Sequence, residues 1–163
     1  MITIRFETGE SLDFPFDSFV GSDFRGANLH RAIFERIDSS CADFTGANLR
    51  NAVFYFAILN GAKMKCAALM NAIFTGSIMR EVDFSESILA YADFSRTDLS
   101  MTNFKNANVE GGDFQGAQLY GANFEVVQIE KCNLFGAFYD GKTVWPEGFD
   151  PCSHGAVKIA NKV

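Results

Sequence analysis

The chain has 163 residues, of which 48% are hydrophobic, and its formal net charge is −6. This length corresponds to one structural domain. The acidic balance argues against direct nucleic-acid binding, which requires clustered Lys and Arg. No apolar run reaches the ~18 residues that a membrane-spanning helix needs, so we expect no membrane span.

Residues 1–11 come first, and in them Ile2, Ile4 and Phe6 alternate with polar residues. This alternation predicts a strand, which we expect to cap the open end of the repeat that follows. The segment lacks a basic stretch followed by an apolar core, so it does not resemble a signal peptide. We therefore expect a cytoplasmic location.

Residues 12–141 contain an internal repeat of five residues. Counting in fives from Phe14 to Tyr139 gives 26 positions, of which twelve are Phe, eight are Leu and only Ser39 is not apolar. Two residues before each of these positions lies a second column, made mostly of Ala, Ser, Thr, Gly and Cys. Such a period indicates a repeat architecture.

A period of five fits neither a helix nor a flat strand, whose faces recur every 3.6 and 2.0 residues. The chain must instead bend once per unit, with the first and third side chains inside and the fourth and fifth at a corner. Ten of the fourteen glycines occupy the fifth position, where a tight turn often needs positive φ. We call the third, inward position of each unit its large slot and the first its small slot. At one unit the large slot holds the small residue Ser39, and the larger Ile37 in the small slot two residues earlier compensates for the lost volume.

When large positions that are 20 residues apart are placed in one column, columns rich in Phe alternate with columns rich in aliphatic residues. This pattern suits a square cross-section with four units per coil. The 26 units would then form about six coils, and at the strand spacing of ~4.8 Å these would give a rod roughly 30 Å long. The small slot is violated at Leu12 and Asp17, so we expect an irregular first coil.

These units resemble the pentapeptide-repeat family, whose pattern is a small residue, Asp or Asn, Leu or Phe, a polar residue and Gly. The segments 42–46, 27–29 and 122–124 match it directly. The resemblance implies an all-β fold, a right-handed quadrilateral β-helix. Residues 142–163 form the expected C-terminal cap and tail, in which Trp145 and Phe149 are the natural lid, and residues 139–151 resemble an ending found in family members from photosynthetic bacteria.

Catalytic chemistry is not indicated. The interior is filled by apolar side chains, and an enzyme needs a concave pocket. The Asp residues before the large positions share their column with Asn, which cannot act as a general base. We therefore assign them local hydrogen bonds to the backbone, and expect Asp98→Asn to have little effect. No metal or cofactor is expected, because the cysteines lack C-x-x-C spacing, and they are read as free thiols.

A candidate protein-interaction patch arises where apolar residues replace Asp or Asn in that column. Large exposed apolar patches usually mark interaction sites, and either a foreign protein or a second copy of the chain fits this one. The patch consists of Ile33, Val53, Tyr55, Phe56, Ile58, Ile73 and Ile78.

Charge is polarised along the repeat: residues 23–80 carry four acids and seven bases, whereas residues 81–130 carry nine acids and two bases. The leading hypothesis is a non-catalytic protein-interaction scaffold whose partner is unknown. The alternative comes from the resemblance, because some pentapeptide-repeat proteins mimic DNA and bind type II topoisomerases such as gyrase. The acidic half favours this alternative, and the basic half opposes it.

Overall fold

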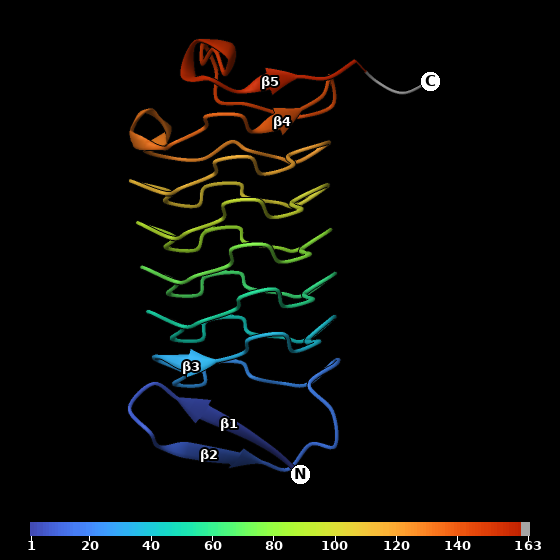
Figure 1. Ribbon diagram of the computed structural model, residues 1–163, viewed down its shortest axis with the longest axis vertical. Helices are drawn as coiled ribbons and strands as arrows, with labels where there is room; N and C mark the ends of the chain where they lie inside the picture. Colours follow the sequence, from blue (N-terminus) through green and yellow to red (C-terminus); the bar gives the residue numbers. More distant parts are fainter. Residues whose placement is uncertain (161–163) are drawn as a thin grey trace.

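The computed structural model describes residues 1–160, so the last three residues of the expected tail, 161–163, lie outside the described residues. The chain winds into a rod of stacked coils, with its N-terminal hairpin at one end and its C-terminal segment at the other (Figure 1). Among the described residues no helix is long and apolar enough to cross a membrane.

Isolated parallel bridges join residues that are 20 apart, from Asp23↔Asp43 through to Gln118↔Phe138. They fall into four ladders, and each is named here after one member. The Asp43 ladder runs from Asp23, the Asn48 ladder from Asn28, the Ile33 ladder from Ile33 and the Ile58 ladder from Asp38. One coil therefore takes four five-residue units, as the columns of the sequence predict, and the fold is β-helix-like.

The corners have the predicted geometry. The amide of Ala57 donates to the carbonyl of Phe54 at 3.0 Å, which closes a four-residue turn whose third residue, Phe56, has a φ of 52°. Type II turns require such a positive φ and favour Gly. Here many non-glycine residues adopt it as well, Arg31, Glu81, Tyr91 and Met101 among them.

The interior is an apolar column filled by the large and small slots. The rings of Phe34 and Phe54 stack with centroids 4.7 Å apart, and Phe44 meets Phe34 edge-on at 5.6 Å. All three side chains are fully buried. Ring stacking at nearly the strand spacing follows because each coil repeats the position of the previous one.

Polar residues inside the small slots bond to the backbone. The hydroxyl of Ser77 donates to the carbonyl of Phe54 at 2.6 Å, and that of Thr97 donates to the carbonyl of Phe74 at 3.0 Å. Ser39, in a large slot, is fully buried and its hydroxyl has no partner among residues 1–160.

At the N-terminus, β1 (Ile2–Phe6) pairs antiparallel with both β2 (Ser11–Phe14) and β3 (Ala32–Ile33). Within residues 1–160 the parallel bridges begin only at Asp23. The first part of the expected repeat, from residue 12, is thus a hairpin strand rather than a coil side. Leu12 and Asp17 are too large for small slots, which explains the departure.

The five-residue frame also slips near the C-terminus. Asn108 bridges Val127, 19 residues on, and Asn123 bridges Val144, 21 residues on. The segment from Val127 to Val144 contains η1 (Ile129–Lys131) and β4 (Phe138–Tyr139). It is followed by η2 (Cys152–His154) and β5 (Val157–Lys158).

β5 pairs in parallel with β4. The indole of Trp145 meets the Phe124 ring edge-on, with the ring centroids 5.2 Å apart. Trp145 therefore covers the C-terminal end of the core.

Candidate interaction surface

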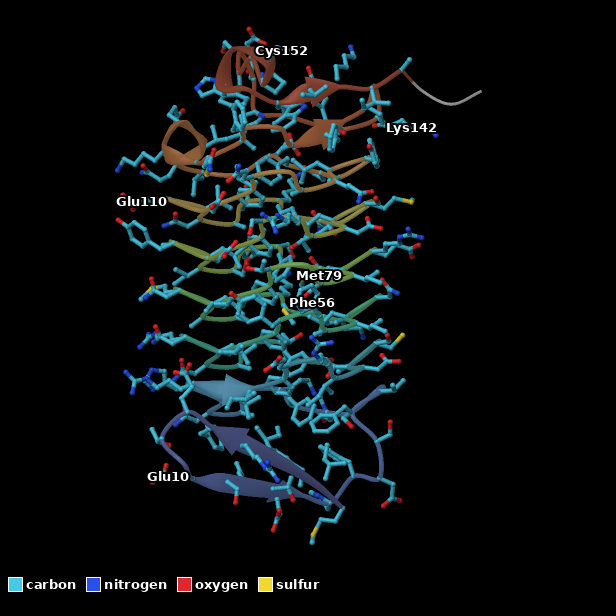
Figure 2. The ribbon with its side chains drawn as sticks, viewed as in Figure 1. Glu10, Phe56, Met79, Glu110, Lys142 and Cys152 are labelled. Carbon is cyan, nitrogen blue, oxygen red and sulfur yellow. The ribbon has the colours of Figure 1, made fainter. Side chains whose placement is uncertain are left out.

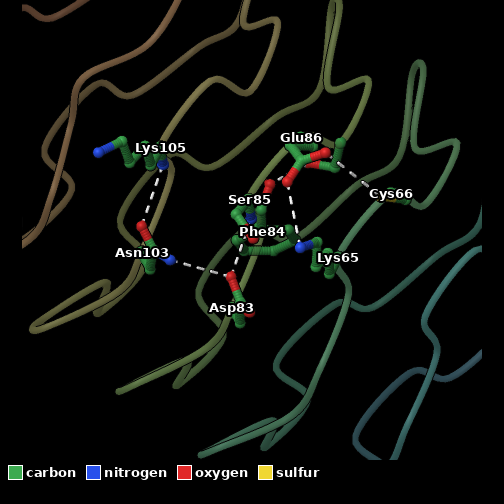
Figure 3. Close-up of polar contacts among 9 residues, drawn as sticks. Lys65, Cys66, Asp83, Phe84, Ser85, Glu86, Asn103 and Lys105 are labelled. Atoms are coloured by element: carbon green, nitrogen blue, oxygen red, sulfur yellow. Dashed lines mark hydrogen bonds and ion pairs between the residues drawn. The ribbon is translucent and has the colours of Figure 1, made fainter.

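The Asp and Asn residues at second positions have the local role that the sequence predicts (Figure 3). The carboxylate of Asp83 accepts from the backbone amide of Ser85 at 3.0 Å and from the side-chain amide of Asn103 at 3.1 Å. Asn103 in turn accepts from the amide of Lys105 at 3.1 Å. These side chains order the corners and link neighbouring coils. An apolar residue in this column gives up such bonds, which makes each replacement notable.

Three such replacements are consecutive. Parallel bridges join Ile33 to Val53 and Val53 to Ile73, so the three side chains form one vertical row. Each is half-buried. Second-position side chains point outward because the small and large slots on either side of them point inward.

The next ladder contributes Ile58 and Ile78, which bridge each other directly. Their exposed fractions are 38% and 43%, among the highest of the aliphatic side chains in the interior coils. The sequence therefore places these two residues correctly beside one another, on the ladder that follows Ile33.

Tyr55 and Phe56 occupy the corner between the two ladders, with their ring centroids 6.0 Å apart. Figure 2 shows Phe56 about halfway along the rod. The residue is 53% exposed, yet its ring has contacts on two sides. The guanidinium of Arg36 lies 5.3 Å from its centroid, and its edge covers Gly76 on the next coil. A fixed aromatic side chain loses little conformational entropy when a partner covers it.

A carboxylate follows the apolar residues on each of these two ladders. Asp98 follows Ile78 on its ladder and pairs with Arg80 at 2.6 Å. Burial raises the pKa of Asp98, but hydrogen bonds from Ser100 and Arg80 outweigh it, so the pKa lies below its ordinary value. Asp93 follows Ile73 and accepts from Thr75 at 2.8 Å. An apolar centre with a polar rim is the usual anatomy of a protein interface.

Other apolar side chains are exposed outside this patch and are not among the residues that the sequence predicts for it. Ile88, Tyr91, Met101 and Phe135 are 44%, 61%, 64% and 67% exposed. The signal for Ile88 was available, since it too replaces Asn in its column.

Ion pairs join neighbouring coils of the rod. Lys65 pairs with Glu86 at 3.1 Å, and Lys131 pairs with Glu110 at 2.6 Å. Arg31, Arg50 and Glu130 form no ion pair within residues 1–160.

The histidines and Cys132 make local contacts. His30 bonds to the side chain of Asn51 at 3.1 Å, and His154 packs on Phe149 at 4.5 Å. Burial raises the pKa of the Cys132 thiol to about 12. Within residues 1–160 no three His, Cys, Asp or Glu side chains lie close enough to hold a metal ion.

An open cavity of about 560 Å³ lies between the N-terminal hairpin and the first coil. Phe6, Glu10, His30 and Arg31 are among its lining residues.

The coils and their corner hydrogen bonds define the molecule as a β-helix-like repeat protein. Comparison with protein-family models matches "Pentapeptide repeats", in eight copies, over residues 40–76, 67–104, 77–116 and 98–136. The chain therefore belongs to the pentapeptide repeat family. No curated protein matches it in a sequence search.

Solved structures of the same family are similar. The pentapeptide repeat protein Rfr23 from the cyanobacterium Cyanothece 51142 shares 25% identity over 77% of this chain and 89% of its own, with a TM-score of 0.57. A pentapeptide repeat protein from the thylakoid lumen of Arabidopsis thaliana shares 34% identity over 61% of this chain, with a TM-score of 0.46. The match covers 66% of the Arabidopsis chain, just under two thirds. QnrB1, a plasmid-mediated fluoroquinolone resistance protein, shares 21% identity over 78% of this chain and 77% of its own, with a TM-score of 0.39.

Proposed function

We propose that the protein is a non-catalytic scaffold that binds a partner protein through the patch of Ile33, Val53, Tyr55, Phe56, Ile58, Ile73 and Ile78. The scaffold is a right-handed quadrilateral β-helix of about six coils at the strand spacing of ~4.8 Å. The proposal rests on one observation. The two apolar rows lie on consecutive ladders, and the ring of Phe56, which Arg36 contacts, lies at the corner between them.

Chemistry and geometry support a binding role over a catalytic one. The large slots are filled by buried Phe and Leu, and the second-position carboxylates are engaged in corner hydrogen bonds. In many interfaces an aromatic side chain that becomes buried, surrounded by weaker contacts, supplies most of the binding energy. We assign this anchoring role to Phe56. We place the protein in the cytoplasm, where its four cysteines would remain as the free thiols that they are here.

The test is quantitative crosslinking capture from the native host with three proteins. The double variant Val53→Asn/Phe56→Ser removes the centre of the patch. Met101→Ser is the matched control, because Met101 is also a corner residue with positive φ and is 64% exposed. We expect specific partners to be lost from the double variant and retained by the wild type and the control. Equal capture by all three would refute the patch as the docking surface.

A DNA-mimic role is the second candidate, and the acidic half of the rod is the observation that favours it. Residues 81–130 have nine acids against two bases. Such a surface suits a cationic groove, and binding there would weaken steeply with salt. The expected result of this candidate is inhibition of gyrase supercoiling at low salt. Unchanged supercoiling over a wide concentration range of the protein would remove it.

A further inference from the structure

The Asn48 ladder carries an outer face that the proposed function does not use. Its members from the N-terminal end are Asn28, Asn48, Ala68, Ile88, Asn108 and Val127. The two central members are apolar and the members beside them are Asn. The amides of Asn28 and Asn48 bond to each other at 2.9 Å, and Ile88 stands out at 44% exposure.

The corner that follows this ladder is polarised. Arg31 and Arg50 border it near the N-terminal end, whereas Glu110, Glu130 and the Lys131 that pairs with Glu110 border it near the C-terminal end. Their order along the rod is set by the stack, since the amide of Arg31 donates to the carbonyl of Arg50 and that of Tyr91 to the carbonyl of Glu110. Glu110 stands at the outer edge of the rod in Figure 2.

The corner that precedes the ladder is polarised in the same sense. Arg25 and Lys65 lie in its N-terminal half, whereas Glu86, Lys105 and Glu125 lie in its C-terminal half. The net charge of both edges therefore changes from basic to acidic in the same direction, although Lys105 and Lys131 offset part of the acidic end.

A two-fold axis between Ala68 and Ile88, lying across the rod, turns a second copy upside down against this face. The operation keeps each corner opposite the same corner and reverses the order of the coils. It sets Ile88 against Ala68 of the second copy. It also sets Arg50 against Glu110, Arg25 against Glu125 and Arg31 next to Glu130. A two-fold interface is isologous, so each of these contacts occurs twice. Of these groups, Glu110, Glu125 and Arg25 each also pair within their own chain, with Lys131, Lys105 and Asp23.

At the same height the operation is unfavourable on the Ile33 ladder. There an axis at the matching height sets Ile73 against Asp93 and Val53 against Asp113 of the second copy. Burying a carboxylate against an aliphatic side chain is unfavourable. At this height the Asn48 face keeps its apolar centre against itself.

We propose that the protein forms an antiparallel two-fold dimer through the Asn48 face. The occupant of this face is a second copy of the chain, and the charge polarity of the rod fixes its direction. Six ladder positions at ~4.8 Å give a face roughly 25–30 Å long. With its corners it is about 20 Å wide, which buries on the order of 1,000–1,200 Å² in total, the lower end for specific interfaces. The dimer is therefore weak, with a dissociation constant in the micromolar range, and it is sensitive to salt.

Sedimentation equilibrium tests the dimer directly. At about 20 mM salt the wild type is expected at twice its 18.0 kDa mass, and at about 0.5 M salt, where screening is strong, as a monomer. Arg50→Glu turns two attractive contacts into repulsive ones and should raise the dissociation constant about 10- to 100-fold. Glu110→Arg should act likewise. The exchange variant Arg50→Glu/Glu110→Arg should restore the dimer, which a misfolded or merely recharged protein would not do.

The apolar centre has its own matched pair of variants. Ile88→Asn restores the residue type of its neighbours in the ladder, so it should fold and weaken the dimer at least tenfold. Ile78→Asn is the control, because Ile78 has nearly the same exposure, 43%, on the Ile58 ladder and should leave the mass unchanged. A monomer at low salt and high concentration, a dimer indifferent to Ile88→Asn, or an exchange variant that stays monomeric would each overturn the proposal.

This dimer and the proposed partner-binding patch can fail separately. Val53→Asn/Phe56→Ser should lose the captured partner and keep the dimer mass. Ile88→Asn should lose the dimer mass and keep the partner.

Discussion

The ring of Tyr91 covers Gly111, the residue one coil later at the same corner. Two ring carbons lie 2.5 Å from the point where a Cβ on Gly111 would be. Phe56 covers Gly76 in the same way. A bulky side chain in the fifth position leans toward the C-terminal end of the rod, so a glycine in the next coil gives it room. These glycines serve two purposes at once, positive φ and space.

Replacing Gly111 by Ala should therefore cost more than replacing a glycine with the same φ and free space. Gly46 is that control, because its φ is +67° and no atom lies within 4 Å of the added Cβ, whereas the φ of Gly111 is +65°. The left-handed conformation alone costs about 1–2 kcal/mol for a non-glycine residue. We expect Gly111→Ala to exceed Gly46→Ala in denaturant unfolding, and Tyr91→Ser/Gly111→Ala to remove the excess. Equal effects of the two single changes would contradict the close packing of Tyr91.

The two buried serines should respond to Ala with opposite signs. Ser39→Ala removes a buried hydroxyl that has no partner within residues 1–160 and should stabilise the fold by up to about 1 kcal/mol. Ser77→Ala removes a hydrogen bond of 2.6 Å to the Phe54 carbonyl and should destabilise it by about 1 kcal/mol. Thermal unfolding measures both, and a loss of stability in Ser39→Ala would show that its hydroxyl is satisfied.

Phe84 is fully buried within a stacked column, 5.2 Å from the ring of Phe104. Phe84→Ala should destabilise the protein by about 3–5 kcal/mol because it leaves a cavity. Phe135→Ala is the surface control, since Phe135 is 67% exposed, and should change stability by no more than about 0.5 kcal/mol. Unfolding of Phe84→Ala at the wild-type midpoint would place that ring outside the core.

Asp98 should make stability depend on pH. Its pKa is lowered in the fold because the bonds from Ser100 and Arg80 outweigh burial. A carboxyl whose folded pKa is depressed contributes stability above its unfolded pKa of about 3.9, and this is lost as the pH falls through the folded value.

Asp98→Asn should therefore cost about 1 kcal/mol at pH 7, discounted for the exposed Arg80, and the cost should shrink below about pH 4. This is more than the small effect that the sequence alone predicts, because the ion pair to Arg80 is visible only in the fold. Asp113→Asn is the control, since Asp113 has no ion pair within residues 1–160 and accepts from Gln115 and Asn133. A cost for Asp98→Asn that is the same at both pH values would contradict the charged role.

The sequence determines the repeat itself. The alternation of small and large slots, the corner residues and the stacking of residues 20 apart all follow from contacts at constant spacing, and each coil repeats them. The bonds of Asp83 and Asn103 to the backbone two residues on are local, so their interchange in one column was enough to predict them. The outward rows of Ile33 and Ile58 follow from the same spacing.

Only the tertiary structure decides what breaks the spacing. The hairpin that replaces the first coil side and the slip at Val127 arise at the ends, where no neighbouring coil imposes its register. The cover of Gly111 by Tyr91 and the pair of Arg80 with Asp98 depend on which way long side chains lean between coils. Their direction comes from three-dimensional packing rather than from local pattern, because residues 18 or 20 apart meet only after the chain has closed a full coil.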